Sequence, residues 1–121
     1  MCAKPPAMKR ILVVEDDLVL QGAIKLVLEW EGYLVSCAAD GQEALDQLRC
    51  GNRPDVILLD WMLPVLDGGR FLQEQRQDPA LAAIPVISVT ALEEADCPGT
   101  AGFIKKPFQP PELLEAIRRH C

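Results

Sequence analysis

The chain has 121 residues, half of them hydrophobic and a quarter charged, which predicts a single globular domain. Its net charge of -6, with scattered lysines and arginines, argues against nucleic acid or an anionic membrane as the main partner. No apolar run is long enough for a membrane span or a signal peptide, and the five cysteines form no zinc or disulfide pattern, so we expect a cytoplasmic protein.

The domain is predicted to occupy residues 10–121, after an irregular segment at residues 1–9. Apolar runs predict five strands, at residues 11–14, 34–37, 56–59, 85–90 and 103–104. Apolar residues at helical spacing predict helices at about residues 17–31, 40–50, 69–77 and 110–120. Strands therefore alternate with helices, which is typical of an α/β fold with a doubly wound, five-stranded parallel sheet and helices on both faces.

One connection in this pattern is short. Only the twelve residues 91–102 lie between Thr90 and Phe103, and Pro98 and Gly99 fall in their middle. A parallel crossover that contains a helix needs about ten to twelve residues at minimum. We therefore expect the fourth of the five helices of such a fold to be shortened or missing.

Polar side chains follow four of the predicted strands. Glu15 and Asp16 come after the first strand, Asp60 after the third, Thr90 ends the fourth, and Lys106 leaves the fifth. Open α/β sheets bind their ligands at the edge where the carboxyl ends of parallel strands meet. Carboxylates crowded together repel one another and favour a hard divalent cation such as Mg²⁺. A carboxylate nucleophile beside a metal, a hydroxyl and an ammonium predicts a phosphoryl-transfer site.

These motifs resemble, in the same order, the signature of the receiver domain of two-component response regulators. The matching segments are Glu15-Asp16-Asp17, Leu59-Asp60-Trp61-Met62-Leu63-Pro64 with Asp67-Gly68, Val89-Thr90-Ala91 and Lys106-Pro107-Phe108. Each motif alone is weak, but four in order, each at a strand end, are highly specific. The resemblance covers almost the whole chain and implies a flavodoxin-like sheet with strand order 2-1-3-4-5.

The resemblance also implies roles for the acidic residues. By position, Asp60 is the phosphoacceptor, and Glu15 and Asp16 are the acidic pair. The implied Mg²⁺ site consists of these three residues and the backbone carbonyl of Met62. Taken alone, Glu15 could equally be a solvated acid at a helix start.

The resemblance assigns more specific roles to three further residues. Thr90 contacts the phosphoryl group and switches on it, Lys106 pairs with it, and Phe103 occupies the aromatic switch position. By default Thr90 would be a strand-end hydroxyl and Phe103 a core aromatic residue. The resemblance to receivers also implies a cis peptide bond between Lys106 and Pro107. A cis bond costs little free energy when the second residue is proline.

The resulting functional prediction is a phosphoacceptor signalling domain rather than an enzyme. It accepts a phosphoryl group from a histidine kinase or phosphotransfer protein and then changes which unknown output protein it binds, as a monomer or weak dimer. Its only catalysis is its own phosphoryl transfer and self-dephosphorylation. Self-dephosphorylation is expected to be slow, because the resemblance implies that Met62 and Leu92 flank the attacking water, and both side chains are apolar.

Three alternatives stay open beside this prediction. A pseudo-receiver would be an unphosphorylated docking module, although the intact acid, threonine and lysine set argues against it. An aspartate-based phosphatase would need a second acid two residues after Asp60, where Met62 stands. A flavin or dinucleotide binder would need a glycine-rich turn where this chain has Glu15-Asp16-Asp17.

Overall fold

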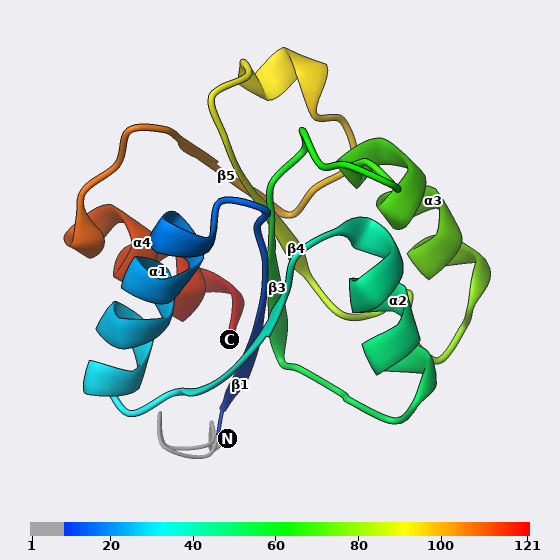
Figure 1. The fold of residues 1–121 in the computed structure, drawn as a ribbon, viewed down its shortest axis with the longest axis horizontal. Helices are drawn as coiled ribbons and strands as arrows, with labels where there is room; N and C mark the ends of the chain where they lie inside the picture. The colour runs from blue at the N-terminus through cyan, green and yellow to red at the C-terminus, as the bar shows by residue number, and fades with distance from the viewer. Residues whose placement is uncertain (1–8) are drawn as a thin grey trace.

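A computed structural model describes residues 9–121, so the irregular segment predicted at residues 1–9 lies outside the described residues except for Lys9 (Figure 1). The described elements are β1 (Arg10–Val14), α1 (Leu18–Trp30), β2 (Leu34–Ala38), α2 (Gly41–Arg49), β3 (Val56–Leu59), α3 (Gly68–Gln77), β4 (Val86–Thr90), the 3-10 turn η2 (Glu94–Asp96), β5 (Gly102–Lys105) and α4 (Pro110–His120). All strand pairs are parallel and their order is β2-β1-β3-β4-β5, which confirms the predicted fold.

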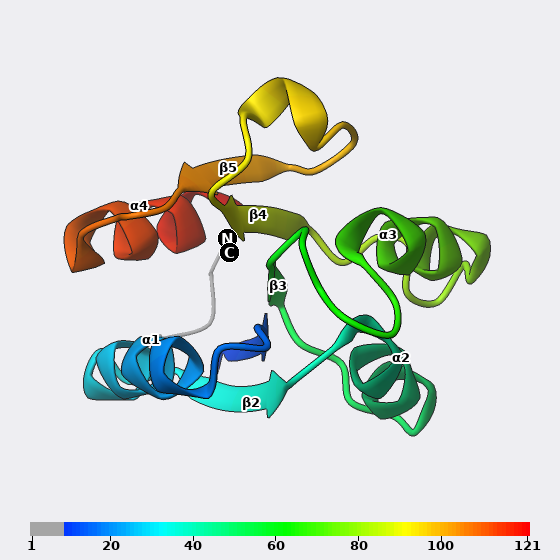
Figure 2. The same cartoon turned by 45° about the horizontal axis from the view of Figure 1, so that its top comes forward.

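The sheet separates two layers of helices, with α1 and α4 on one face and α2 and α3 on the other (Figure 2). Successive side chains of a strand point to opposite faces, so each strand contributes to both cores. In β1, Ile11 and Val13 pack with α1 and α4, whereas Leu12 and Val14 pack with α2 and α3. Because both faces of the central strands are buried, the sequences of these strands are continuous apolar runs.

Each helix begins at a polar residue that accepts or exchanges hydrogen bonds with the first turn. Asp17, Asp40 and Asp67 accept from backbone N–H groups of α1, α2 and α3, respectively. Gln109 forms a capping box with Glu112 at the start of α4. These caps satisfy N–H groups that have no partner within the helix, and they fix where each loop from the sheet ends.

The connection from β4 to β5 contains no α-helix, in agreement with its predicted shortening. Its regular structure is limited to η2, and Cys97 directly after this turn is only 2% exposed. The side chain of Lys105 on β5 pairs with Glu93, and the N–H of Ala101 donates to the carbonyl of Val86 at 2.8 Å. A buried thiol and these bonds hold the segment where a helix would otherwise pack.

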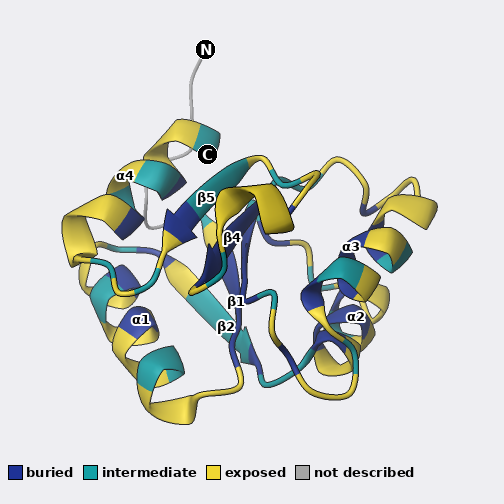
Figure 3. Ribbon diagram, turned by 90° about the horizontal axis from the view of Figure 1, so that it is seen from above, coloured by how far each residue is buried: buried dark blue, intermediate teal, exposed yellow. Residues whose placement is uncertain are grey.

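Burial is concentrated in the strands and in the inner faces of the helices, and the outer faces are exposed (Figure 3). All four residues of β3 are at most 1% exposed. Among the residues that the structure describes, no helix combines the length and the apolar character that a membrane crossing requires.

Candidate functional site

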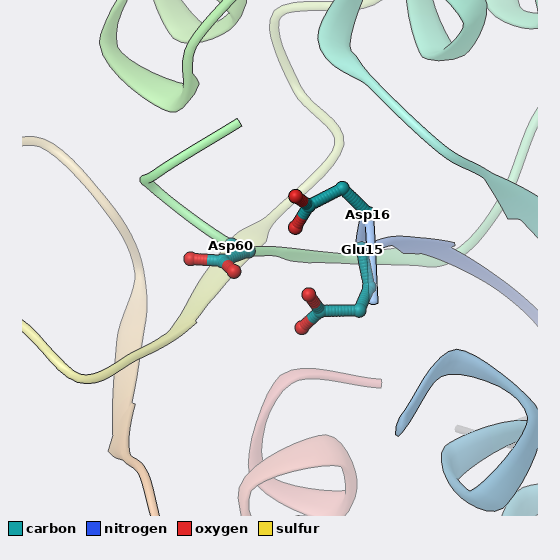
Figure 4. A group of neighbouring side chains, drawn as sticks. All are labelled: Glu15, Asp16 and Asp60. Carbon is teal, nitrogen blue, oxygen red and sulfur yellow. The ribbon is translucent and has the colours of Figure 1, made fainter. Parts of the chain in front are cut away.

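Three carboxyl groups lie together at the carboxyl ends of β1 and β3. Figure 4 shows Glu15 and Asp16 beside Asp60. One carboxylate oxygen from each residue lies within 4.8 Å of the others. Glu15 and Asp60 are only 2% and 7% exposed, whereas Asp16 is exposed to solvent. Two of the three carboxyl groups are therefore buried, and the third faces solvent.

Local backbone geometry positions these acids. The N–H of Glu15 donates to the carbonyl of Ala38, and the N–H of Asp60 donates to the carbonyl of Val14, both at 3.0 Å. These bonds continue the β1–β2 and β1–β3 ladders by one residue, so each acid follows directly from a rigid strand. The structure therefore brings Glu15, Asp16 and Asp60 together, as the sequence predicts.

Lys106 joins the two buried acids. Its Nζ lies 2.7 Å from Oε1 of Glu15 and 3.0 Å from Oδ2 of Asp60. The backbone N–H of Lys106 donates to the carbonyl of Thr90 at 2.8 Å, which fixes the chain as it leaves β5. The Lys106–Pro107 peptide bond is cis, as predicted.

The crowding changes the proton affinity of Glu15. The pKa of this carboxyl is raised from 4.5 to about 7. Burial is the largest cause and the negative charge of Asp60 adds to it, while hydrogen bonds from Lys106 and from the N–H of Asp17 oppose the rise. For Lys106, burial lowers the pKa, but the hydrogen bonds to Glu15 and Asp60 outweigh it and leave a net rise. Lys106 is thus held as a cation.

The donor set fits a hard divalent cation. The three side chains offer only oxygen ligands, which is the preference of Mg²⁺ rather than of a soft metal. A single ammonium faces three carboxyl groups, so one more cation would reduce their repulsion. The cluster of Glu15, Asp16 and Asp60 can therefore bind a metal ion.

The remaining predicted site residues differ in how far they are buried. Thr90 is fully buried at the end of β4, and its hydroxyl accepts a long hydrogen bond of 3.4 Å from the N–H of Leu92. Met62 is 61% exposed, and its N–H donates to Oδ1 of Asp60 at 3.1 Å. Phe103 lies half-buried on β5, paired in register with Ser88 of β4.

Two residues support the site although the sequence analysis gave neither of them a role there. Gln21 on α1 donates from Nε2 to the carbonyls of Glu15 and Ala38, at 3.0 and 3.2 Å. Gly68 lies so close to the loop after β3 that an added Cβ would come within 2.7 Å of the Cα of Trp61. A polar residue on the inner side of an apolar helix is a sequence signal that could have indicated the role of Gln21. No local sequence feature indicates the contact between Gly68 and Trp61.

Comparison with known proteins gives the same picture as the geometry. The sequence profile of the response regulator receiver domain matches residues 11–118. The phosphate regulon transcriptional regulatory protein PhoB of Escherichia coli is 39% identical over 116 residues, which cover 91% of this chain and 50% of PhoB. The DNA-binding dual master transcriptional regulator RpaA of Synechocystis is 36% identical, over 92% of this chain and 48% of RpaA. The chain spans about half the length of these relatives.

Solved structures with the same fold include receiver domains from several bacteria. The chemotaxis response regulator CheY4 of Vibrio cholerae has a TM-score of 0.87 and 30% identity, with 94% of this chain and 99% of that chain covered. The receiver domain of sensor histidine kinase PA1611 from Pseudomonas aeruginosa, with a magnesium ion coordinated in its active site cleft, has a TM-score of 0.85 and 35% identity, with 93% and 96% covered. This chain belongs to the response regulator receiver domain family.

Proposed function

We propose that Asp60 is the phosphoacceptor of a two-component signalling domain formed by residues 10–121. The observation that carries the proposal is the contact of Lys106 with both Asp60 and Glu15, because it places a cation and a second acid beside one buried carboxylate. Asp60 is 7% exposed, so its carboxylate is partly desolvated and held in one place. A positioned, desolvated carboxylate is a suitable nucleophile toward phosphorus.

In the proposed step, a carboxylate oxygen of Asp60 forms a bond to phosphorus while the P–N bond of a phosphohistidine breaks. The donor imidazole leaves with the electron pair of the broken bond. Lys106 then exchanges a carboxylate contact for a contact with the transferred phosphoryl group and neutralises part of its charge. Thr90 turns its hydroxyl from the N–H of Leu92 toward the same group, and Phe103 responds as the switch residue.

Glu15, Asp16, Asp60 and the backbone carbonyl of Met62 would hold Mg²⁺. When bound, this ion supplies positive charge that offsets the charge of the phosphoryl oxygens. The support in this chain is the cluster of oxygen donors. The magnesium ion in the related PA1611 receiver domain agrees with the choice of metal.

The donor in this proposal is a histidine kinase or a phosphotransfer protein, and the phosphorylated domain then binds an output protein in the cytoplasm. Receiver domains of this family work with histidine kinases, and one similar solved structure is itself part of such a kinase. The DNA-binding activity named for RpaA belongs to a protein about twice as long as the matched segment, so nucleic acid is no partner of this domain in the proposal.

Mass spectrometry of the intact protein tests the assignment after incubation with acetyl phosphate and Mg²⁺. The parent chain should gain one phosphoryl group, and Asp60→Asn should gain none. Asp46→Asn, which changes an exposed carboxylate on α2, is the matched control and should behave like the parent. A folded parent chain that gains no phosphoryl group would instead indicate a pseudo-receiver that docks without phosphorylation.

The lifetime of the phosphorylated form is proposed to be long. The side chains of Met62 and Leu92 have no group that can orient a water molecule for attack on the acyl phosphate. Met62→Asn supplies such a group and should accelerate loss of the phosphoryl group by about tenfold or more. Val65→Asn, on the same loop, should leave the rate unchanged; equal decay of Met62→Asn and the parent would show that Met62 does not limit hydrolysis.

A further inference from the structure

The peptide unit between Glu15 and Asp16 must keep one orientation if both residues are to serve one metal site. In an extended strand, consecutive side chains point to opposite faces of the sheet. Here the chain leaves β1 and bends at Asp16, and an oxygen of each residue lies within 4.8 Å of the other and of an Asp60 oxygen (Figure 4). The convergence of the two carboxylates therefore depends on the orientation of the planar peptide that joins them.

The two residues differ in how firmly their own contacts hold them. The N–H of Glu15 donates to the carbonyl of Ala38 at 3.0 Å, and its carboxylate accepts from Nζ of Lys106 at 2.7 Å and from the N–H of Asp17 at 3.2 Å. The Asp16 carboxylate is exposed, and no hydrogen bond or ion pair holds it in the described part of the chain. The direction of the Asp16 side chain is therefore set by its backbone.

Gln21 holds the carbonyl of this peptide unit. Its Nε2 donates to the carbonyl of Glu15 at 3.0 Å and to the carbonyl of Ala38 at 3.2 Å. Both partners are acceptors, so only the NH₂ end of the carboxamide fits between them. The N–H of Gln21 itself donates to the carbonyl of Asp17 at 2.8 Å, within the first turn of α1. The Glu15 carbonyl is thus tied to the start of a helix and to the end of β2.

We propose that Gln21 is a positioning residue for the metal site, because its carboxamide holds the Glu15–Asp16 peptide and so keeps the Asp16 carboxylate beside those of Glu15 and Asp60. The inference rests on the proposed function, since it concerns the Mg²⁺ site assigned there. Both hydrogen bonds of the carboxamide reach backbone carbonyls and no carboxylate, so Gln21 acts through Asp16.

The expected effect on metal affinity is moderate. Replacing a residue that holds metal ligands in place commonly lowers metal affinity by about 10-fold to 100-fold. Gln21→Met keeps the length of the side chain but has no N–H donor. Because Glu15 keeps its contacts with Lys106 and Asp17 in this variant, we expect the lower value, about a 10-fold loss of Mg²⁺ affinity.

The chain contains a matched control for this pair of hydrogen bonds. Gln75 on α3 donates from Nε2 to the carbonyls of Leu81 and Ile84, at 2.8 and 3.0 Å, and is only 1% exposed. These carbonyls precede β4, so they lie at the amino end of the parallel sheet, away from the acidic site. Gln75→Met therefore removes the same two bonds as Gln21→Met, at a place remote from the metal ligands.

Titration with Mg²⁺ alone, followed by the backbone amide shifts in NMR spectra, tests the proposal without a phosphodonor. Gln21→Met should bind about 10-fold more weakly than the parent, and Gln75→Met should bind like the parent. Urea unfolding should show that both variants are less stable, because each leaves two carbonyls without their donor. Parent-like affinity in Gln21→Met, an equal loss in Gln75→Met, or a parent chain that binds no Mg²⁺ would overturn the proposal.

The rate of phosphorylation by acetyl phosphate, measured over a range of Mg²⁺ concentrations, separates positioning from chemistry. Gln21→Met should need about 10-fold more Mg²⁺ for half of its maximal rate and should reach the parent rate at saturation, because Asp60 and Lys106 are unchanged. A lower saturating rate with an unchanged half-maximal concentration would refute the positioning role. A parent chain that gains no phosphoryl group would refute the proposed function instead, and the NMR titration would still decide the role of Gln21.

Discussion

Lys106 is the residue on which the proposed chemistry depends most. Its ammonium contacts Glu15 and Asp60 within 3.0 Å, although its side chain is 19% exposed. At rest this lysine reduces the repulsion between the two acids, and in the proposed function it also contacts the phosphoryl group on Asp60. The neighbouring Lys105 points away and pairs with Glu93.

Replacement of Lys106 should therefore affect phosphorylation far more than replacement of Lys105. We expect Lys106→Met to slow phosphorylation of Asp60 by on the order of a hundredfold, the usual effect of removing one group that stabilises transition-state charge. Lys105→Met is the control and should change the rate little. The measurement is the initial rate of phosphoryl incorporation with a small phosphodonor. Equal rates for the two variants would show that the contact is only structural.

The raised pKa of Glu15 predicts a pH dependence of stability. The unfolded chain loses the Glu15 proton near pH 4.5, whereas the folded chain keeps it up to about pH 7. Between these values the folded state binds more protons, so the free energy of unfolding falls as pH rises. We expect this group to contribute about 1 to 3 kcal/mol of lost stability across that window.

Urea unfolding of the parent and of Glu15→Gln, in the presence of a chelator, measures this contribution. The difference between the two proteins isolates Glu15 from the other titrating groups. The parent should lose stability relative to the variant as pH rises from 4.5 to about 7. A constant difference over that range would mean that Glu15 is already ionised in the folded chain at low pH.

At the scale of elements, two helical glycines have opposite surroundings. An added Cβ on Gly22 of α1 meets nothing within 4 Å, whereas on Gly41 of α2 it would overlap the backbone oxygen of Leu66. We expect Gly22→Ala to raise the free energy of unfolding by about 0.5 to 1 kcal/mol. Gly41→Ala should lower it by about 1 to 3 kcal/mol. Chemical denaturation at low protein concentration compares the two, and a stabilising Gly41→Ala would show that α2 can move away from the loop after β3.

The elements also explain what the sequence could predict. Each strand contains an apolar run, and a polar residue of the site follows four of the five runs, so the strands, their type and the acidic cluster were all predictable. The length of the connection from Thr90 to Phe103 was sufficient to predict a missing helix. The role of Cys97 in holding that connection was not, because a single apolar residue in a loop has no periodicity from which to infer burial.

Features that depend on long-range packing could not be predicted from the sequence. The contacts of Gln21 with two carbonyls and of Gly68 with Trp61 depend on how loops from different strands meet. The switch roles of Thr90 and Phe103 and the metal-binding role of the Met62 carbonyl came from family resemblance alone. They stay predictions, because in the resting geometry the Thr90 hydroxyl accepts a hydrogen bond from the N–H of Leu92 and Phe103 is half-buried.

At the scale of the whole molecule, the site should couple metal binding to stability. A cation that binds the folded cluster, and not the unfolded chain, raises the free energy of unfolding by about 1.4 kcal/mol at ten times its dissociation constant. We expect Mg²⁺ to raise the melting temperature of the parent chain and to have little effect on Asp16→Asn. Asp46→Asn is the control and should respond like the parent. An equal response of Asp16→Asn would place the metal outside the cluster.

The site is also assembled from residues that are far apart along the chain. Lys106 is 91 residues from Glu15 and 46 residues from Asp60, and β5, which presents it, is the last strand of the sheet. During synthesis on the ribosome, Asp60 emerges long before its cationic neighbour exists. A nascent or truncated chain that lacks β5 thus offers a carboxylate without the group that orients it. Competence to receive a phosphoryl group should arise only after β5 and Lys106 have been synthesised and have folded onto the sheet, so a shorter nascent chain would not react with the donor.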